Sequence, residues 1–128
     1  MKSKKKSGKS TRRFLVDTNL FIATIKNPKK ETTSLRLLLD MIDDTTIALI
    51  GNEFLIIDKT EVVEVDEKFL RICKLYFPED ELIDIYHAAT CLQEGAILIT
   101  NDRHFDKIKD EKIIEVWSIS MAIAEFGI

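Results

Sequence analysis

Three acidic residues stand where an α/β fold would bring their carboxylates together. Asp17 is the last residue of an apolar segment, and Glu53 and Asp102 follow two further apolar or β-branched segments within three residues. Each segment has the composition of a buried strand. Ligands of open α/β folds bind at the carboxyl ends of the strands. We therefore expect the three carboxylates to meet at one edge of a sheet.

A fourth acid, Asp84, lies near the start of a predicted helix. Ala88, Cys91 and Gly95 follow it at i+4, i+7 and i+11, so they share its face of that helix. Such small and apolar residues indicate a face that packs closely, which predicts that Asp84 is not a freely solvated acid. The acids that precede it are expected to face solvent: Glu79, Asp80 and Glu81.

Converging carboxylates point to a bound cation. Like charges that share a buried site repel one another, and some would otherwise take up a proton. Hard oxygen ligands suit Mg²⁺ or Mn²⁺, so the four acids are candidate catalytic and metal-binding residues. Each also has a structural interpretation: Asp17 as a helix cap, Glu53 as a first-turn acid that favours a helix dipole, Asp84 as a capping or ion-paired acid, and Asp102 as an Asx-turn residue.

The elements that would position these acids alternate along the chain. Strands are predicted at residues 13–17, 45–50, 96–100 and 112–117, and helices at 18–27, 33–42, 53–62, 66–76, 79–94, 103–108 and 118–126. Strands separated by helices favour a parallel sheet with helices on both faces. We predict an α/β three-layer sandwich whose central, mostly parallel sheet has four to five strands.

Charge divides the chain into two parts. The first 13 residues hold seven of the 19 basic side chains and none of the 22 acidic ones, which leaves 12 basic against 22 acidic for the rest. Residues 1–12 are therefore predicted to be a basic, disordered arm, and residues 13–128 a single domain. The arm would either contact nucleic-acid phosphates or serve as a solubilising tail.

Composition also limits the cellular setting. No apolar run approaches the roughly 18 residues of a membrane span, and no apolar segment of signal-peptide length follows the basic N-terminus. We expect a cytoplasmic protein that does not enter a membrane. Two cysteines, Cys73 and Cys91, lie in helical apolar patterns and are predicted to be reduced thiols packed in the core.

Three short motifs resemble those of PIN-domain nucleases. They are LVDTN at residues 15–19, DIYHAA at 84–89 and TNDRHF at 100–105, which is similar to the Thr-x-Asp-x-x-Phe segment of that family. Their order and spacing together are fairly specific. The resemblance extends from about residue 13 to the end of the chain and implies a PIN-like fold.

This resemblance also implies a function. It implies a metal-dependent endoribonuclease that hydrolyses RNA, with the four family acids mapped onto Asp17, Glu53, Asp84 and Asp102. Glu61 and Glu64 compete for the second position, and Glu53 is preferred because it directly follows the strand. The resemblance further implies that polar groups orient the last acid or contact substrate: Asn19, Thr100 and Asn101.

Several biological settings fit this activity. Many small prokaryotic members are VapC-type toxins, which implies an antitoxin partner. A first Asp at residue 17, behind a basic arm, also fits a housekeeping RNA-processing nuclease. A catalytically inactive module that binds RNA or protein is the alternative. The apolar helices predicted at 33–42 and 118–126 would pack either within the chain or in a homodimer. His87 and His104 are either packed or surface residues, or donors to RNA phosphate or to an acid.

Overall fold

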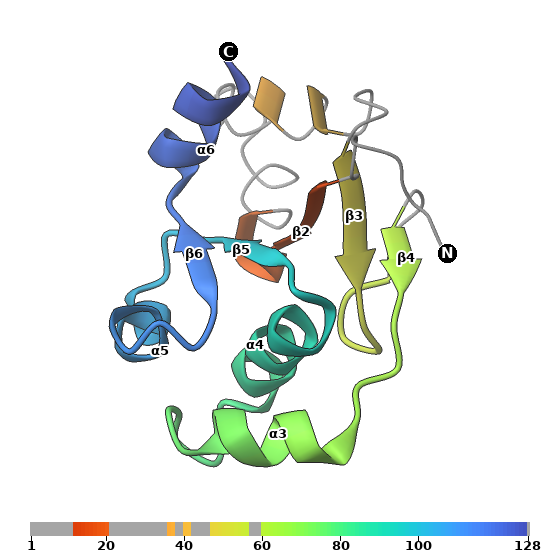
Figure 1. The fold of residues 1–128 in the computed structure, drawn as a ribbon, viewed down its shortest axis with the longest axis vertical. Coiled ribbons are helices and arrows are strands. Elements are labelled where there is room, and N and C mark those ends of the chain that lie inside the picture. Colours follow the sequence, from red (N-terminus) through yellow and green to blue (C-terminus); the bar gives the residue numbers. More distant parts are fainter. Residues whose placement is uncertain (1–11, 21–35, 38–39, 42–46, 57–59, 128) are drawn as a thin grey trace.

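The computed structural model describes residues 12–20, 36–37, 40–41, 47–56 and 60–127. Its centre is a five-stranded sheet in the order β4-β3-β2-β5-β6 (Figure 1). The strands are β2 (Arg12–Val16), β3 (Ile47–Gly51), β4 (Thr60–Val62), β5 (Ile97–Ile99) and β6 (Glu115–Trp117). All neighbouring strands are parallel. The predicted parallel α/β sheet is therefore confirmed.

Helices cover both faces of this sheet. They are α3 (Glu67–Lys74), α4 (Leu82–Glu94), the 3₁₀ turn η1 (Arg103–Phe105), α5 (Asp106–Asp110) and α6 (Ile119–Phe126). Figure 1 shows α3, α4 and α5 on one side of the sheet and α6 on the other. This arrangement confirms the three-layer sandwich.

The side chains of β2 alternate between two hydrophobic clusters, one on each face of the sheet. Leu15 is buried in the cluster that includes α3, α4 and α5, whereas Phe14 and Val16 are buried in the cluster that includes α6. Successive side chains of a strand point to opposite faces, so a central strand that is covered on both sides must be apolar throughout. The register of β2 also fixes Asp17, because it directly follows the three buried residues that end this strand.

Local signals set several helix ends as predicted. The Asp66 carboxylate accepts a hydrogen bond from the Lys68 amide and caps α3, and the Ser118 hydroxyl accepts one from the Met121 amide and caps α6. Gly95 ends α4 in the left-handed conformation, with φ of 64°, which suits a residue without a side chain.

The predicted helix at residues 53–62 is wrong. Residues 53–54 form a turn that is closed by a 2.9 Å hydrogen bond from the Leu55 amide to the Asn52 carbonyl. The chain then returns as the edge strand β4, and the Val63 amide donates to the Gly51 carbonyl at 2.9 Å. The β-branched Thr60 and Val62 favour this strand, and pairing with β3 satisfies its backbone.

The remaining predictions concern two helices, the boundary of the basic arm, the packing of α6 and membrane spans. Residues 18–20, 36–37 and 40–41 are helical as predicted, and the remainder of those two helices lies outside the described residues. Arg12, which we assigned to the arm, is instead the first residue of β2, and residues 1–11 are not described. Ala122 on α6 packs within the chain, while Met121 is exposed. Within the described part, no helix combines the length and the apolar character needed to cross a bilayer.

Both cysteines are buried thiols, as predicted. Cys73 and Cys91 pack in the core on the α3 and α4 side and are not disulfide-bonded. Burial raises the pKa of Cys73 to about 12 and raises that of Cys91 further. Both groups therefore remain protonated at neutral pH and act as small apolar side chains.

Candidate metal centre

A cleft of about 590 Å³ opens where β2 and β5 end and α4 begins. We call it the acidic cleft. It is lined by Asp17, Thr18, Asn19, Phe54, Asp80, Glu81, Leu82, Ile83, Asp84, Asp102 and His104. Three of the four predicted site acids, Asp17, Asp84 and Asp102, are therefore brought together. They come from three separate elements, as the strand-end argument required for two of them.

Asp17 and Asp102 are linked by a single hydroxyl. The Thr100 hydroxyl donates to the Asp17 carboxylate at 2.6 Å and accepts from the Asp102 amide at 2.9 Å. Asp17 is only 2% exposed, and its other oxygen accepts from the Asn19 amide at 3.3 Å. Thr100 thus orients the first acid and the backbone of the last, which agrees with the polar role expected for it.

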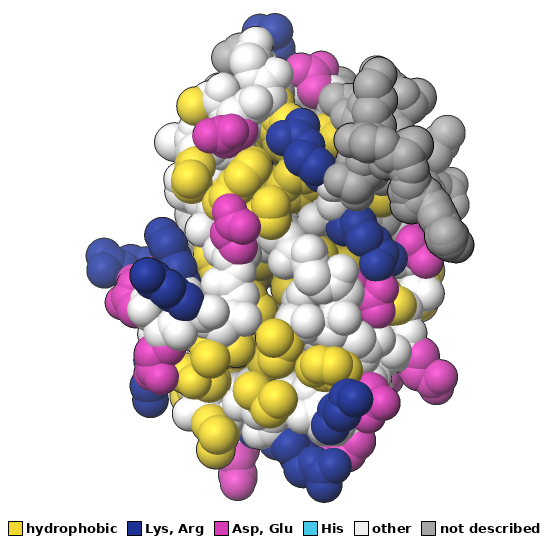
Figure 2. Space-filling view, in the orientation of Figure 1, with side chains coloured by type: hydrophobic (Ala, Val, Ile, Leu, Met, Phe, Trp, Pro, Cys, Tyr) yellow, Lys and Arg dark blue, Asp and Glu magenta, His cyan; other side chains and the backbone are white. Residues whose placement is uncertain are grey.

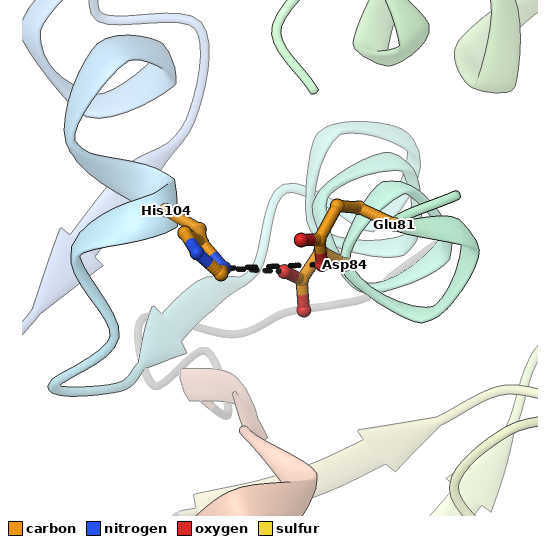
Figure 3. Close-up of side chains that lie close together, drawn as sticks. All are labelled: Glu81, Asp84 and His104. Carbon is orange, nitrogen blue, oxygen red and sulfur yellow. Dashed lines mark hydrogen bonds and ion pairs between the residues drawn. The ribbon is translucent and has the colours of Figure 1, made fainter. Parts of the chain in front are cut away.

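On the other side of the cleft, His104 lies among three carboxylates. Its Nδ1 is 3.3 Å from an oxygen of Asp84, 3.3 Å from one of Asp102 and 3.8 Å from one of Glu81. Figure 3 shows His104 reaching from the segment after β5 toward Glu81 and Asp84 at the start of α4. The last acid also caps η1, because the Asp102 carboxylate accepts from the His104 amide at 2.9 Å.

The surroundings of two side chains in the cleft, Asp84 and His104, raise their pKa values. The pKa of Asp84 is raised to about 6, mainly by burial and then by the hydrogen bond with Glu81 and the charges of Asp102 and Asp17. The carboxylate of Asp102 is the main cause of a raised pKa for His104, followed by a hydrogen bond to Asp84. Both shifts report an excess of negative charge in a restricted space.

This donor set fits a divalent cation. Glu81, Asp84 and His104 each offer a ligand atom, and these atoms lie within 4.8 Å of one another. Carboxylate oxygens suit Mg²⁺ and Mn²⁺, and imidazole is a common additional ligand of transition metals.

Glu53, the fourth predicted acid, lies elsewhere. It lines a neighbouring cavity of about 470 Å³ with Tyr86. Burial, followed by the charge of Glu53 and a hydrogen bond to it, raises the pKa of the Tyr86 hydroxyl.

Asn101 also points away from the acids, because its side-chain oxygen accepts from the Ile119 amide at 3.0 Å at the start of α6. Asn19 lines the acidic cleft, as expected for a residue near substrate.

Glu81 and His104 are the residues that the strand-end argument missed. Glu81, expected to face solvent, is partly buried and turned toward Asp84. A signal for both is present in the sequence, since Glu81 precedes Asp84 by three residues and His104 follows Asp102 by two. Such spacings place side chains next to a site residue on a helix or a tight turn.

Comparison with known families is consistent with this geometry. A model of the PIN domain matches residues 51–111. Residues 51–111 are thus similar in sequence to the PIN domain. The matched segment includes Glu53, Asp84 and Asp102, but it begins well after Asp17 and does not include it. A comparison with curated proteins found no match. PIN domains are generally nucleases that use divalent metal ions, and the acidic cleft and the parallel sheet agree with that family.

Proposed function

We propose that this protein is a PIN-like, divalent-metal-dependent endoribonuclease that hydrolyses RNA phosphodiester bonds in the acidic cleft. The observation that carries the proposal is the convergence of Asp17, Asp84 and Asp102 from three elements into one cleft. The mutual repulsion of these three acids opposes folding unless a cation balances it.

Different residues of the cleft would bind the ion and orient its ligands. Asp17, Asp84 and Asp102, with Glu81 beside them, would hold Mg²⁺ or Mn²⁺. When bound, a divalent ion supplies positive charge for the phosphate and makes water a stronger acid. Thr100 keeps the Asp17 carboxylate in one orientation through its 2.6 Å hydrogen bond.

His104 is suited to the substrate side of the cleft. Its side chain is 57% exposed, and the acids around it raise its pKa, which favours the charged imidazolium. An imidazolium at the rim can donate an N–H to a phosphate oxygen of RNA. His104 would thus offset part of the repulsion between an acidic cleft and a polyanion.

The deciding experiment is cleavage of a mixed structured RNA with Mn²⁺, with Mg²⁺ and with EDTA, using the wild type and the Asp17→Asn variant. We expect cleavage that needs the metal and is lost in Asp17→Asn, while the variant keeps its circular dichroism spectrum. Unchanged cleavage by Asp17→Asn would contradict the assignment. Absence of both metal binding and cleavage in the wild type would favour the binding-module alternative.

The biological setting is a second part of the proposal. A toxin of a toxin–antitoxin pair should arrest growth when expressed alone, and Asp17→Asn should relieve the arrest. A housekeeping RNA-processing nuclease should cause no arrest, and its loss should leave unprocessed RNA. An antitoxin protein would be the partner in the first case. Assembly as a homodimer stays a prediction that analytical ultracentrifugation tests.

A further inference from the structure

A fully buried imidazole lies behind the acidic cleft and joins three elements. His87 on α4 is 0% exposed. Its Nε2 is 2.8 Å from the Thr18 hydroxyl, and its Nδ1 is 3.2 Å from the side-chain nitrogen of Asn52, which follows β3. Complete burial excludes the role of phosphate donor that was considered for this histidine.

The hydrogen-bond partners determine where the His87 proton lies. The Asn52 side-chain oxygen accepts from the Phe54 amide at 2.9 Å, which fixes the orientation of the amide group. Its nitrogen must then donate, both to His87 Nδ1 and to the Thr90 hydroxyl at 2.8 Å. Nδ1 is therefore an acceptor, so a neutral His87 carries its proton on Nε2 and donates it to Thr18.

Thr90 completes the network without a conflict. Its hydroxyl accepts from Asn52 and donates to the Tyr86 carbonyl at 2.6 Å. Both nitrogens of the His87 ring are thus used, and the amide of Asn52 has partners on both sides. A buried network that is satisfied in this way specifies one arrangement of the elements, whereas an apolar contact tolerates sliding.

This network connects two of the three elements that carry site acids. Thr18 directly follows Asp17, and His87 lies about one helical turn after Asp84 on α4. The hydrogen bond between Thr18 and His87 therefore ties the end of β2 to the start of α4. The charges of Asp17 and Asp84 repel each other across the cleft, which would push these two segments apart.

We propose that His87 is a positioning residue whose hydrogen bond to Thr18 keeps Asp17 and Asp84 together in the acidic cleft, where a divalent cation would bind. This inference rests on the proposed metal-dependent function and adds a residue that does not touch the ion or the substrate. His87 acts through Thr18 on one side and through Asn52 on the other.

The test is the affinity of the folded protein for Mn²⁺, measured by electron paramagnetic resonance of the free ion. Thr18→Val keeps the shape of the side chain but removes the hydroxyl. We expect its Mn²⁺ affinity to fall at least about tenfold, and Thr18→Ser to restore most of it. Ser118→Ala is the matched control, because it removes a hydroxyl that caps α6 outside the acidic cleft, and its affinity should stay within about twofold of the wild type.

A second readout does not depend on the metal. In ¹⁵N spectra of the metal-free protein, His87 should show a protonated Nε2 and a bare Nδ1, and Thr18→Val should shift the Nε2 signal. A proton on Nδ1, or wild-type Mn²⁺ affinity in Thr18→Val, would overturn the inference alone. A wild-type protein that binds no Mn²⁺ would overturn the proposed function together with it.

Discussion

At the scale of single residues, Asp84 shows the conflict between the stability of the fold and the chemistry of the cleft. The residue is 8% exposed and has Glu81, Asp102 and Asp17 as its charged neighbours, and burial is the main cause of its pKa of about 6. An acid whose pKa is higher in the folded state than in the unfolded state weakens the fold when it ionises. In the metal-free protein at neutral pH, Asp84 is therefore destabilising.

The first prediction follows from the sign of this shift. Between the unfolded value of about 4 and the folded value of about 6, the folded state binds more protons, so stability falls as the pH rises. In EDTA at pH 8, Asp84→Asn should raise the free energy of unfolding by up to about 3 kcal/mol. At pH 4 the gain should largely vanish. Urea unfolding at both pH values measures this, and an equal effect at both would show that charge is not the cause.

A second prediction separates two glutamates. Glu81 lines the acidic cleft with Asp84, whereas Glu53 lines the neighbouring cavity with Tyr86. Glu81→Gln should lower Mn²⁺ affinity by about tenfold, which corresponds to about 1.4 kcal/mol, because it removes a charged oxygen near the ion. Glu53→Gln is the matched control and should change the affinity less than about threefold. The reverse ranking would support the original mapping of Glu53.

Residue types and strand ends predicted much of this site. Asp17 and Asp102 could be predicted because each follows a strand of clearly apolar composition. The carboxyl ends of parallel strands lie at the same edge of the sheet, which brings these two acids together. Asp84 was found from the small residues on its helix face. Glu81 and His104 could not be placed in the same way, because their positions depend on how η1 approaches the start of α4, and packing sets that approach.

At the scale of elements, the turn after β3 shows where sequence patterns mislead. The segment after Gly51 has helix-forming residues, but the Leu55 carbonyl lies only 2.1 Å from where a Cβ on Gly51 would be. The chain folds back tightly there and then pairs as β4. Caps such as Asp66 and Ser118 were predictable because they act within three residues, whereas β4 exists only through pairing with β3.

A third prediction tests this close approach. Gly51→Ala should lower the free energy of unfolding by about 3 kcal/mol, because a backbone carbonyl cannot move as freely as a side chain. Gly95→Ala is the comparison, since Gly95 has a positive φ but open space around it. Its effect should be about 1 kcal/mol. Chemical denaturation ranks the two, and a larger loss at Gly95 would contradict the assigned role of Gly51.

At the scale of the whole molecule, the distribution of charged side chains does not favour binding of RNA, which is a polyanion. The face in Figure 2 shows Lys and Arg side chains interspersed with Asp and Glu rather than gathered over one element. Some arginines of the described part are already engaged: Arg13 pairs with Glu61 and Glu94, and the Arg12 guanidinium lies over the ring of Phe126. The described residues on this face therefore offer a polyanion no concentrated basic patch.

The fourth prediction concerns the basic residues that precede β2. Residues 1–11 contain five lysines and no acid, and each lysine that neutralises a phosphate of single-stranded RNA contributes about 0.7 to the slope of log affinity against log salt. In an Asp17→Asn background that prevents cleavage, deleting residues 1–11 should flatten that slope by up to about 3.5. Replacing the five lysines by glutamine should have the same effect, and a scrambled arm of unchanged composition should bind like the parent. Fluorescence anisotropy with a labelled RNA measures all three, and an unaltered slope after deletion would assign RNA binding to the domain alone.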